Sequence, residues 1–455
     1  MHFDRWRAVP RNLSVLRDRT VATLLAARSI SLLGNAIAPV ALAFAVLAMP
    51  GGSATDLGLI LAARTVTQVA FVLLGGVLAD RLPKYRVMVG SDIAAAIMQA
   101  GVASLVILGH ANLPALAVLA ALNGAAAAVF EPASRSIMPQ LVPADALQSA
   151  NALLKFSMRG GSIIGAALAG LLVAAFGPGP ALAVDAGTFL VSALVLMSIR
   201  APRHTAPSAP GRTMLAQLIE GWREFTARQW VWAMVGQLAF VNILLAGSFY
   251  VLGPVVAEQS LGGAPAWSAI LTAQAVGFVA GTFVAMRIRP RYPLRVAALM
   301  TACFSLSLFL LAGPAPLVLI AAAAFVAAIC IDVFEVTIDT TLQQHIPKES
   351  LSRVMSYEAL GSFAFVPLGM AAAGPVAEAV GVGPTLAVAG ALIVLSAFAI
   401  LLLPSVRNIR SVPTSDRAEG SPEPTVSNET TLAPDPAASP DDVPAARDAE
   451  LRESR

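Results

Sequence analysis

The chain has 455 residues, of which 57% are hydrophobic and only 13% are charged. Soluble domains carry about 25% charged residues, so this chain has too few charges to cover a surface that faces water. The composition therefore excludes an ordinary soluble protein and indicates that much of the surface faces lipid.

Twelve apolar stretches follow one another along the chain. About 20 apolar residues are needed for a helix to cross a hydrocarbon core of about 30 Å, and each stretch is long enough. Ala, Leu, Val and Gly fill them with little alternation, which excludes a membrane β-barrel. The sequence therefore predicts an all-α membrane protein. The predicted spans are 21–48, 57–79, 86–109, 113–134, 151–176, 180–199, 230–256, 265–287, 294–312, 315–338, 356–379 and 383–404.

The basic residues divide the connections between these spans into two sets. Lys and Arg gather in the N-terminal tail and in the connections 80–86, 200–228 and 287–295, whereas alternate connections such as 49–56 contain neither. Because basic loops stay in the cytoplasm, we expect both termini to be cytoplasmic. Only three of the 30 basic residues are lysines and Ala is abundant, which is typical of a GC-rich bacterial genome. The expected location is the cell inner (plasma) membrane.

The second half of the chain repeats the first. The segment FEPASRSIMPQLVPADAL begins at Phe130 and aligns without gaps with FEVTIDTTLQQHIPKESL, which begins at Phe334, 204 residues later. The same offset pairs Gly165 with Gly369. Each copy falls in spans four to six of its half, so the sequence predicts two parallel six-helix repeats.

These patterns divide the chain into five predicted segments. Helical spacing of apolar residues in the central linker, including Trp222 and Phe225, predicts an amphipathic helix on the membrane surface. The C-terminal segment is rich in Pro, Ser, Asp and Glu, a composition that predicts disorder. The segments are a cytoplasmic N-terminal tail (1–20), a first six-helix half (21–199), the cytoplasmic linker (200–229), a second six-helix half (230–404) and a cytoplasmic tail (405–455).

Two halves of six helices, a central linker and a charged turn between spans two and three together resemble the major facilitator superfamily. The segment GVLADR (76–81) is similar to the family signature in that turn, although Pro83 stands where the family has glycine and the basic pair is displaced to Lys84 and Arg86. The runs that begin at Phe130 and at Val184 are similar to the branch that contains the enterobactin exporter and macrolide and drug efflux proteins. The resemblance covers about 21–404.

The resemblance implies an inner gate built from this charged turn. Asp80 would lie near the positive N-terminal end of span eleven, and an arginine of the turn would pair with Glu131. Glu335, the repeat partner of Glu131, would act in the same way opposite Arg287, Arg289 or Arg291. The alternative is a basic turn that only fixes topology. The expected gating and charge-network residues are Gly76, Asp80, Arg81, Lys84, Arg86, Asp92, Glu131 and Glu335.

Charged residues also lie inside the predicted spans, where each costs about 2.5–3.5 kcal/mol on insertion scales. Arg64 and Asp185 are candidates for substrate contact or coupling, or else for structural ion pairs or snorkelling; spans two and six need not be neighbours, so the sequence does not predict that the two pair with each other. Asp332, Glu335 and Asp339 share one face of span ten, in its inner third or at its cytoplasmic edge. Asp332 and Asp339 are therefore candidates for proton coupling or for gate structure, and a solvated position at the edge is a further alternative for Asp339.

The fold implied by the resemblance has a central cavity lined by spans one, four, seven and ten. Asn35 is the polar candidate for substrate contact that we single out there. Few fixed charges and several aromatic residues favour a lipophilic or weakly polar solute. The other lining candidates are Ser31, Asn123, Gln237, Phe240, Asn242, Phe249 and Tyr250.

We expect a secondary active transporter that exports a small lipophilic molecule, such as a drug, a secondary metabolite or a siderophore, by proton-driven alternating access. Uptake or exchange of a small nutrient, or a membrane sensor that transports nothing, are the alternatives. The four histidines lack metal-ligand spacing and no phosphate-binding loop GxxxxGK[ST] occurs, so we expect no enzyme activity, cofactor or metal site. The expected partners are the small-molecule substrate, protons and lipid; we expect a monomer and no nucleic acid.

Overall fold

The structure, a computed structural model, describes residues 19–142, 146–199, 222–313 and 315–411. Within these ranges every regular element is helical, and twelve helices are long and apolar enough to cross a membrane. This confirms the predicted all-helical class and the number of spans. The chain divides into a compact unit 1–411 and a second unit 412–455, and the second unit lies outside the described residues.

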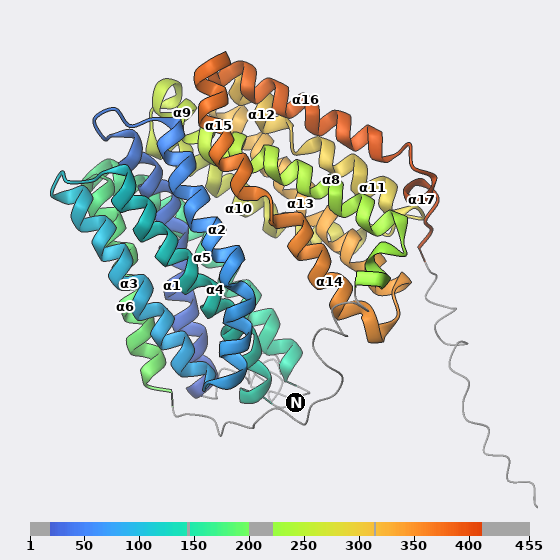
Figure 1. Ribbon diagram of the computed structural model, residues 1–455, viewed down its shortest axis with the longest axis horizontal. Coiled ribbons are helices and arrows are strands. Elements are labelled where there is room, and N and C mark those ends of the chain that lie inside the picture. Colours follow the sequence, from blue (N-terminus) through green and yellow to red (C-terminus); the bar gives the residue numbers. More distant parts are fainter. Residues whose placement is uncertain (1–18, 143–145, 200–221, 314, 412–455) are drawn as a thin grey trace, which may run out of the picture. The chain divides into compact units, whose positions relative to one another are not determined.

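The first six spans are continuous helices (Figure 1). The third packs against the fourth and sixth, the first against the fifth and sixth, and the second against the fourth. The six are α1 (Arg19–Leu47), α2 (Ala54–Arg81), α3 (Lys84–Ile107), α4 (Leu113–Leu141), α5 (Leu147–Phe176) and α6 (Pro178–Met197).

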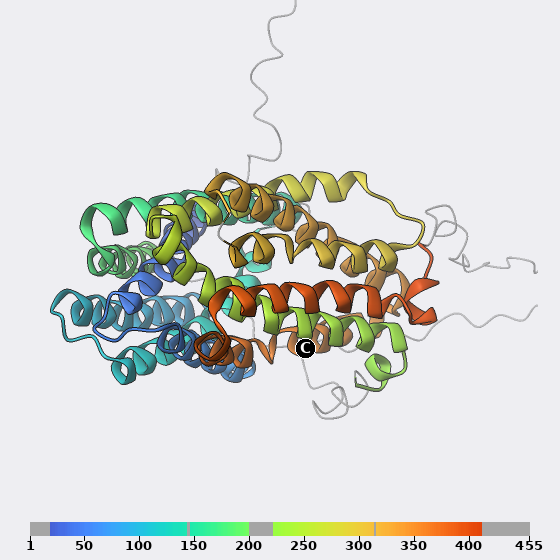
Figure 2. The ribbon, with the colours of Figure 1, turned by 90° about the horizontal axis from the view of Figure 1, so that it is seen from above.

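Three of the last six spans are built from shorter pieces, and the other three are continuous helices. Figures 1 and 2 both show the helix that begins the seventh span beside the helix of the twelfth, and the two are in contact. The elements are α8 (Gln229–Leu245), η3 (Ala246–Leu252), α9 (Gly253–Val256), η4 (Ala257–Leu261), α10 (Ala264–Arg287), α11 (Pro293–Cys303), α12 (Leu306–Ala312), α13 (Leu317–His345), α14 (Lys348–Phe363), α15 (Val366–Val380), α16 (Val382–Ile400) and α17 (Pro404–Arg407).

Three of these six spans are interrupted, and local sequence explains two of the breaks. In span eleven, Pro367 has no N–H to donate to Phe363, the residue at which α14 ends. In span nine, the Ser305 hydroxyl donates to the carbonyl of Ala302 (2.7 Å), which competes with the helical ladder. Span seven instead widens into the π-helical segments η3 and η4, which in other proteins often mark functional sites.

The internal repeat is visible in the helix bounds. Helices α4 and α13 start at Leu113 and Leu317 and end at Leu141 and His345, so both bounds are 204 residues apart. Helices α6 and α16 start at Pro178 and Val382, again 204 residues apart. The offset read from the sequence is therefore confirmed in spans four, six, ten and twelve.

Helices α4 and α13 continue seven residues beyond the predicted spans, which ended at 134 and 338. The apolar pattern stops there, but the backbone hydrogen bonds continue until shortly before Pro143 and Pro347, because a residue that precedes proline disfavours helix. Asp332 consequently lies near the middle of α13 and not in its inner third, as the predicted span had implied.

The helix ends define two ends of the bundle. Only Leu82 and Pro83 separate α2 from α3, and we call this end of the bundle the basic end because Lys84 and Arg86 follow. At the other end, which we call the opposite end, Ser53 and Asp56 form a capping box at the start of α2.

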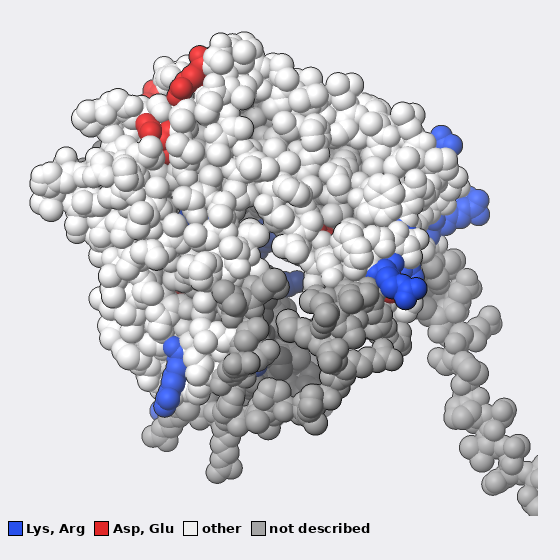
Figure 3. Space-filling model, in the orientation of Figure 1, with Lys and Arg blue, Asp and Glu red and all other residues white. Residues whose placement is uncertain are grey.

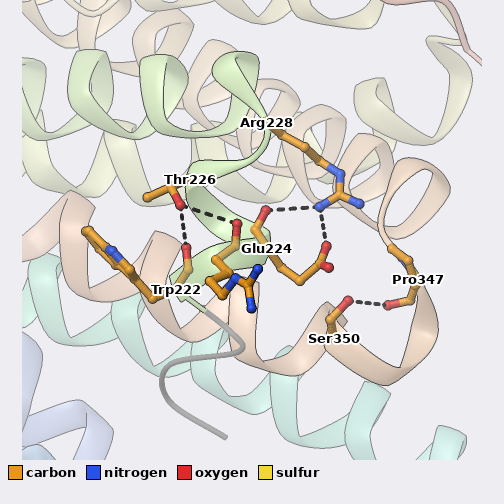
Figure 4. A network of polar contacts seen from close by, with 7 residues as sticks. Trp222, Glu224, Thr226, Arg228, Pro347 and Ser350 are labelled. Carbon is orange, nitrogen blue, oxygen red and sulfur yellow. Dashed lines mark hydrogen bonds and ion pairs between the residues drawn. The ribbon is translucent and has the colours of Figure 1, made fainter. Parts of the chain in front are cut away.

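Residues 222–228 are the part of the linker that the structure describes, and they lie just before α8 (Figure 4). Arg228 Nη1 contacts Glu224 Oε2 at 2.6 Å, one helical turn apart. Phe225 is buried and Trp222 is exposed, and both rings pack against Tyr357 of α14. The remainder of the predicted amphipathic helix lies outside the described residues.

Candidate functional site

The two halves meet closely where α2 packs against α15, towards the opposite end. Gly374 faces the backbone of Thr55, and Gly58 faces the carbonyl of Met370, so closely that a Cβ atom at either glycine would overlap backbone atoms. Thr55 Oγ1 also donates a hydrogen bond to Glu378 Oε1 at 2.7 Å. Glycine permits this approach because it has no side chain.

A second close contact joins α5 to α10 near the same end. A Cβ atom at Gly170 would overlap the side chain of Ser268 and approach Pro265 too closely. Beside it lies a groove of about 720 Å³ between α5, α10 and α13, lined mostly by apolar residues. We call Gly58, Gly170 and Gly374 together the glycine closure.

An ion pair also joins the halves, between the middle of α13 and α5. Arg159 Nη2 lies 3.1 Å from Asp332 Oδ1, and the Thr282 hydroxyl donates to Asp332 Oδ2 at 2.9 Å. The guanidinium lies 4.9 Å from the centre of the Phe278 ring. Asp332 is only 4% exposed, whereas the Arg159 side chain is 42% exposed. We call the Arg159–Asp332 pair the ionic tie.

Further charges surround the ionic tie. Glu335 lies within electrostatic range of Asp332, Asp339 and the tie's guanidinium, as the three-then-four spacing on α13 predicted. Lys155, one turn before Arg159 on α5, interacts with Asp339. Glu358 of α14 interacts with Glu335 and Asp339. Figure 3 shows basic and acidic atoms at the edge of a hollow in the middle of the visible face.

The resemblance had suggested a different set of partners for Glu335. Arg287, Arg289 and Arg291 are all exposed, at or just beyond the end of α10. A cation that does interact with Glu335 is Arg159, which belongs to the other half.

A second charged cluster lies within the first half. Arg28, 4% exposed on α1, places Nη2 3.6 Å from Glu131 Oε1 and its guanidinium 5.0 Å from the centre of the Phe130 ring. Asp92, 2% exposed on α3, accepts a hydrogen bond of 2.6 Å from the Ser192 hydroxyl and interacts electrostatically with Arg28. This Arg28 cluster connects α1, α3, α4 and α6.

Arg64 and Asp185 are brought within electrostatic range of each other, a pairing that the sequence had not suggested. Arg64 Nε donates to Asn123 Oδ1 at 3.3 Å, between α2 and α4. Asp185 is 1% exposed, and its Oδ1 has no hydrogen-bond partner among the described residues. Gly34 of α1 packs directly against this carboxylate.

The amide candidates of the cavity are held by neighbouring groups. Asn35 Nδ2 donates to the carbonyl of Ser31 (3.1 Å), and Gln237 Nε2 donates to the Thr301 hydroxyl (3.1 Å). Asn242 donates to a carbonyl of α14 (3.0 Å). Within the described ranges, no group of three or more His, Cys, Asp or Glu side chains could hold a metal ion.

The charged turn between α2 and α3 is described only in part. Lys84 Nζ donates to the carbonyl of Ser136 at 2.9 Å, near the C-terminal end of α4. Arg86 is exposed and donates from Nε to the Tyr85 hydroxyl. The side chains of the other predicted gate residues of this turn lie outside the described residues; they are Gly76, Asp80 and Arg81.

Sequence reasoning missed Arg28, Lys155 and Arg159 as site residues. Arg28 was detectable as a charge seven residues inside the first apolar span, because such a position needs a partner. Lys155 and Arg159 are four residues apart and so share one face of a helix that is otherwise mostly apolar. The acidic partners of Lys155 and Arg159 lie on α13 in the other half, and no local sequence pattern connects α5 with α13.

Comparison with known proteins agrees with this architecture. The family model of the Major Facilitator Superfamily matches residues 21–363. The multidrug efflux pump Tap of Mycolicibacterium fortuitum is 28% identical over 395 residues, which cover 83% of this chain and 93% of that protein. The enterobactin exporter EntS of Escherichia coli O6:K15:H31 is 26% identical over 371 residues, which cover 77% of this chain and 84% of that protein.

Solved structures share the fold at low sequence identity. The nucleoside transporter NupG matches with a TM-score of 0.69 and 14% identity over 84% of this chain and 98% of that chain. A bacterial homologue of the human lysosomal transporter Spinster, inward-facing and unoccupied, matches with a TM-score of 0.67 and 16% identity over 87% of this chain and 99% of that chain. These relatives and fold neighbours are transporters and not enzymes. Since the family model matches most of its length, the chain belongs to the Major Facilitator Superfamily and is a multi-pass membrane transporter.

Proposed function

We propose that this chain is a secondary active exporter of a small, largely hydrophobic molecule, driven by the proton gradient across the plasma membrane. The observation that carries the proposal is that two different contacts join the halves. Glycines pack the halves tightly together towards the opposite end, and an ion pair joins them at the middle of α13. Two relatives, a multidrug efflux pump and an enterobactin exporter, support export as the direction.

The proposed mechanism is alternating access by rocking of the two halves. With both termini and the basic end in the cytoplasm, the glycine closure seals the outer side and the substrate enters from the inside. In the alternate conformation Asp80 contacts the N-terminal end of α14 and so closes the inner side. The other gating and charge-network residues support this contact; they are Gly76, Arg81, Lys84, Arg86, Asp92 and Glu131. The contact of Lys84 with α4 supports a structural connection between this turn and the helix that carries Glu131.

Asp332 is the proton carrier that we favour. Its carboxylate holds the guanidinium of Arg159, so protonation removes the charge that joins the two halves. Asp339 and Glu335 lie close enough to influence the same step. The Arg64–Asp185 pair, with Asn35, is a second candidate for coupling or substrate contact, supported by the unpartnered Asp185 oxygen. Both halves of the site come from one chain, which supports a monomer.

The test is efflux of lipophilic dyes and antibiotics from pump-deficient cells that express either the wild type or Asp80→Asn at matched levels. Each is measured with and without a protonophore. We expect extrusion by the wild type that collapses with the protonophore and in the variant. A wild type that does not differ from empty cells contradicts export, and flux into liposomes then distinguishes uptake from a sensor that transports nothing.

A further inference from the structure

The ionic tie has the contacts of a binding site for an organic cation. One oxygen of Asp332 receives the Arg159 guanidinium, and the other accepts a hydrogen bond from Thr282, which fixes the carboxylate. The ring of Phe278 lies against the guanidinium. A buried carboxylate together with an aromatic face is the combination with which proteins bind guanidinium and ammonium groups.

The surroundings of the tie also favour a positive ligand. Asp332, Glu335, Asp339 and Glu358 belong to one electrostatically connected group, and Lys155 and Arg159 are among the cations that interact with it. Among these six side chains, acidic groups outnumber basic groups by four to two. Such an excess raises the local concentration of cations. Since the Arg159 side chain is 42% exposed, a ligand can approach the guanidinium.

We propose that Asp332, Phe278 and Thr282 form a binding site for an organic cation and that Arg159 occupies this site when no substrate is bound. The ammonium or guanidinium group of a substrate takes over both the ion pair and the aromatic face, and it displaces Arg159. Because Arg159 belongs to the first half and Asp332 to the second, displacement breaks the ionic tie between them. The inference rests on the proposed export function and adds a substrate class, aromatic or lipophilic molecules that carry a positive charge.

Competition by an internal group lowers the apparent affinity for substrate. If Arg159 occupies the site in about nine of ten molecules, the apparent affinity is about one tenth of the intrinsic one. Removal of Arg159 is therefore expected to tighten cation binding about tenfold. A neutral molecule of similar shape does not compete with the guanidinium for the carboxylate, so its binding is expected to stay unchanged.

The experiment measures binding of tetraphenylphosphonium and of neutral triphenylphosphine oxide to the purified full-length protein. Arg159→Ala should bind the cation about tenfold more tightly than the wild type, with no change for the neutral compound. Arg291→Ala removes the same charge at an exposed position beyond the end of α10 and is the matched control, expected to change cation binding by less than about twofold. Arg159→Met retains most of the side-chain bulk and replaces the alanine variant if that one does not fold.

Two further variants test the role of the carboxylate. Asp332→Asn should weaken cation binding at least about tenfold, and Arg159→Ala should then give no gain in the Asp332→Asn background. Unchanged cation binding in Arg159→Ala overturns the inference. An equal gain for the neutral compound, or no cation binding in any variant, also overturns it. Binding is measured without transport, so a protein that binds as expected but exports nothing contradicts the proposed function and not this site.

Discussion

The two contacts between the halves, the glycine closure and the ionic tie, are stabilised by different forces. At the closure, α2 meets α15 through backbone atoms, and the attraction is van der Waals packing that acts only at short range. At the tie, a buried carboxylate meets a half-exposed guanidinium, and the attraction is electrostatic. Salt and protonation therefore change the tie and leave the closure unaffected.

The difference separates two tasks. The closure sets how near the halves can approach each other, since any side chain at Gly374 or Gly58 keeps them apart. The tie can respond to its surroundings, because a proton or a cation competes for the same carboxylate. A transporter needs both a firm seal and a contact that its substrate can release.

The largest expected effect comes from breaking the closure with Gly374→Leu. The new side chain meets the backbone of Thr55, which cannot move away as a flexible side chain can. At about 3 kcal/mol, the upper part of the usual range for overpacking, the population of this conformation falls about a hundredfold. We expect efflux to fall to background, and a short cross-linker between Thr55→Cys and Glu378→Cys to lose most of its yield.

Gly187→Leu is the matched control, because nothing lies within 4 Å of the position of its Cβ atom on α6. It should retain both efflux and the cross-link. Normal efflux by Gly374→Leu would show that the halves do not need this close approach.

The next largest effect is a loss of stability, and it should differ between two arginines when each is replaced by alanine, because one side chain is buried and the other is half-exposed. Arg28 has a side chain that is 5% exposed, and its loss leaves Asp92 buried without that charge. Breaking such a buried pair costs about 3 kcal/mol. Arg159 is 42% exposed, so water can take its place beside Asp332, and its loss should cost only about 1 kcal/mol after allowance for solvent screening. The apparent melting temperature in detergent should therefore fall much further for Arg28→Ala, and equal falls would contradict this ranking.

The fold was largely predictable from the sequence, because the apolar spans and the 204-residue repeat are properties of composition and periodicity. The helix ends at the basic end were predicted less well. Six of the seven residues at 339–345 are polar, yet α13 continues, since backbone hydrogen bonds do not depend on side-chain polarity. Prolines end these helices more reliably than the loss of hydrophobicity does.

The site was only partly predictable, for a physical reason. Asp332 was recognisable as a charge in an apolar span, but its partner Arg159 is 173 residues away in sequence. Only the packing of α5 against α10 and of α10 against α13 brings the two together. Arg64 and Asp185 show the same limit, since their proximity depends on how the helices of the first half are arranged around each other.

A smaller effect is expected from a double-mutant cycle on Arg159→Ala and Asp332→Asn. The coupling energy of the tie should be about 1 kcal/mol at low salt and should decrease at about 1 M salt, where the screening length is about 3 Å. The measurement is the apparent melting temperature of the four proteins at both ionic strengths. A Gly58→Ala variant, which perturbs only the closure, should show the same shift at both, and a salt-sensitive shift there would remove the distinction between the two contacts.

The smallest expected effect tests whether a charge that stays within one half behaves like the tie. Lys84 donates to the carbonyl of Ser136 near the end of α4, where a cation interacts favourably with the helix dipole. Lys84→Met should lower stability by about 0.3–1 kcal/mol, whereas Arg86→Met at the exposed neighbouring position should change it by less. Because neither contact crosses between the halves, the ratio of cation to neutral binding should stay at the wild-type value in both variants. A changed ratio in Lys84→Met would mean that the charged turn affects cation binding at Asp332. Contacts within one half and contacts between the halves would then not act independently.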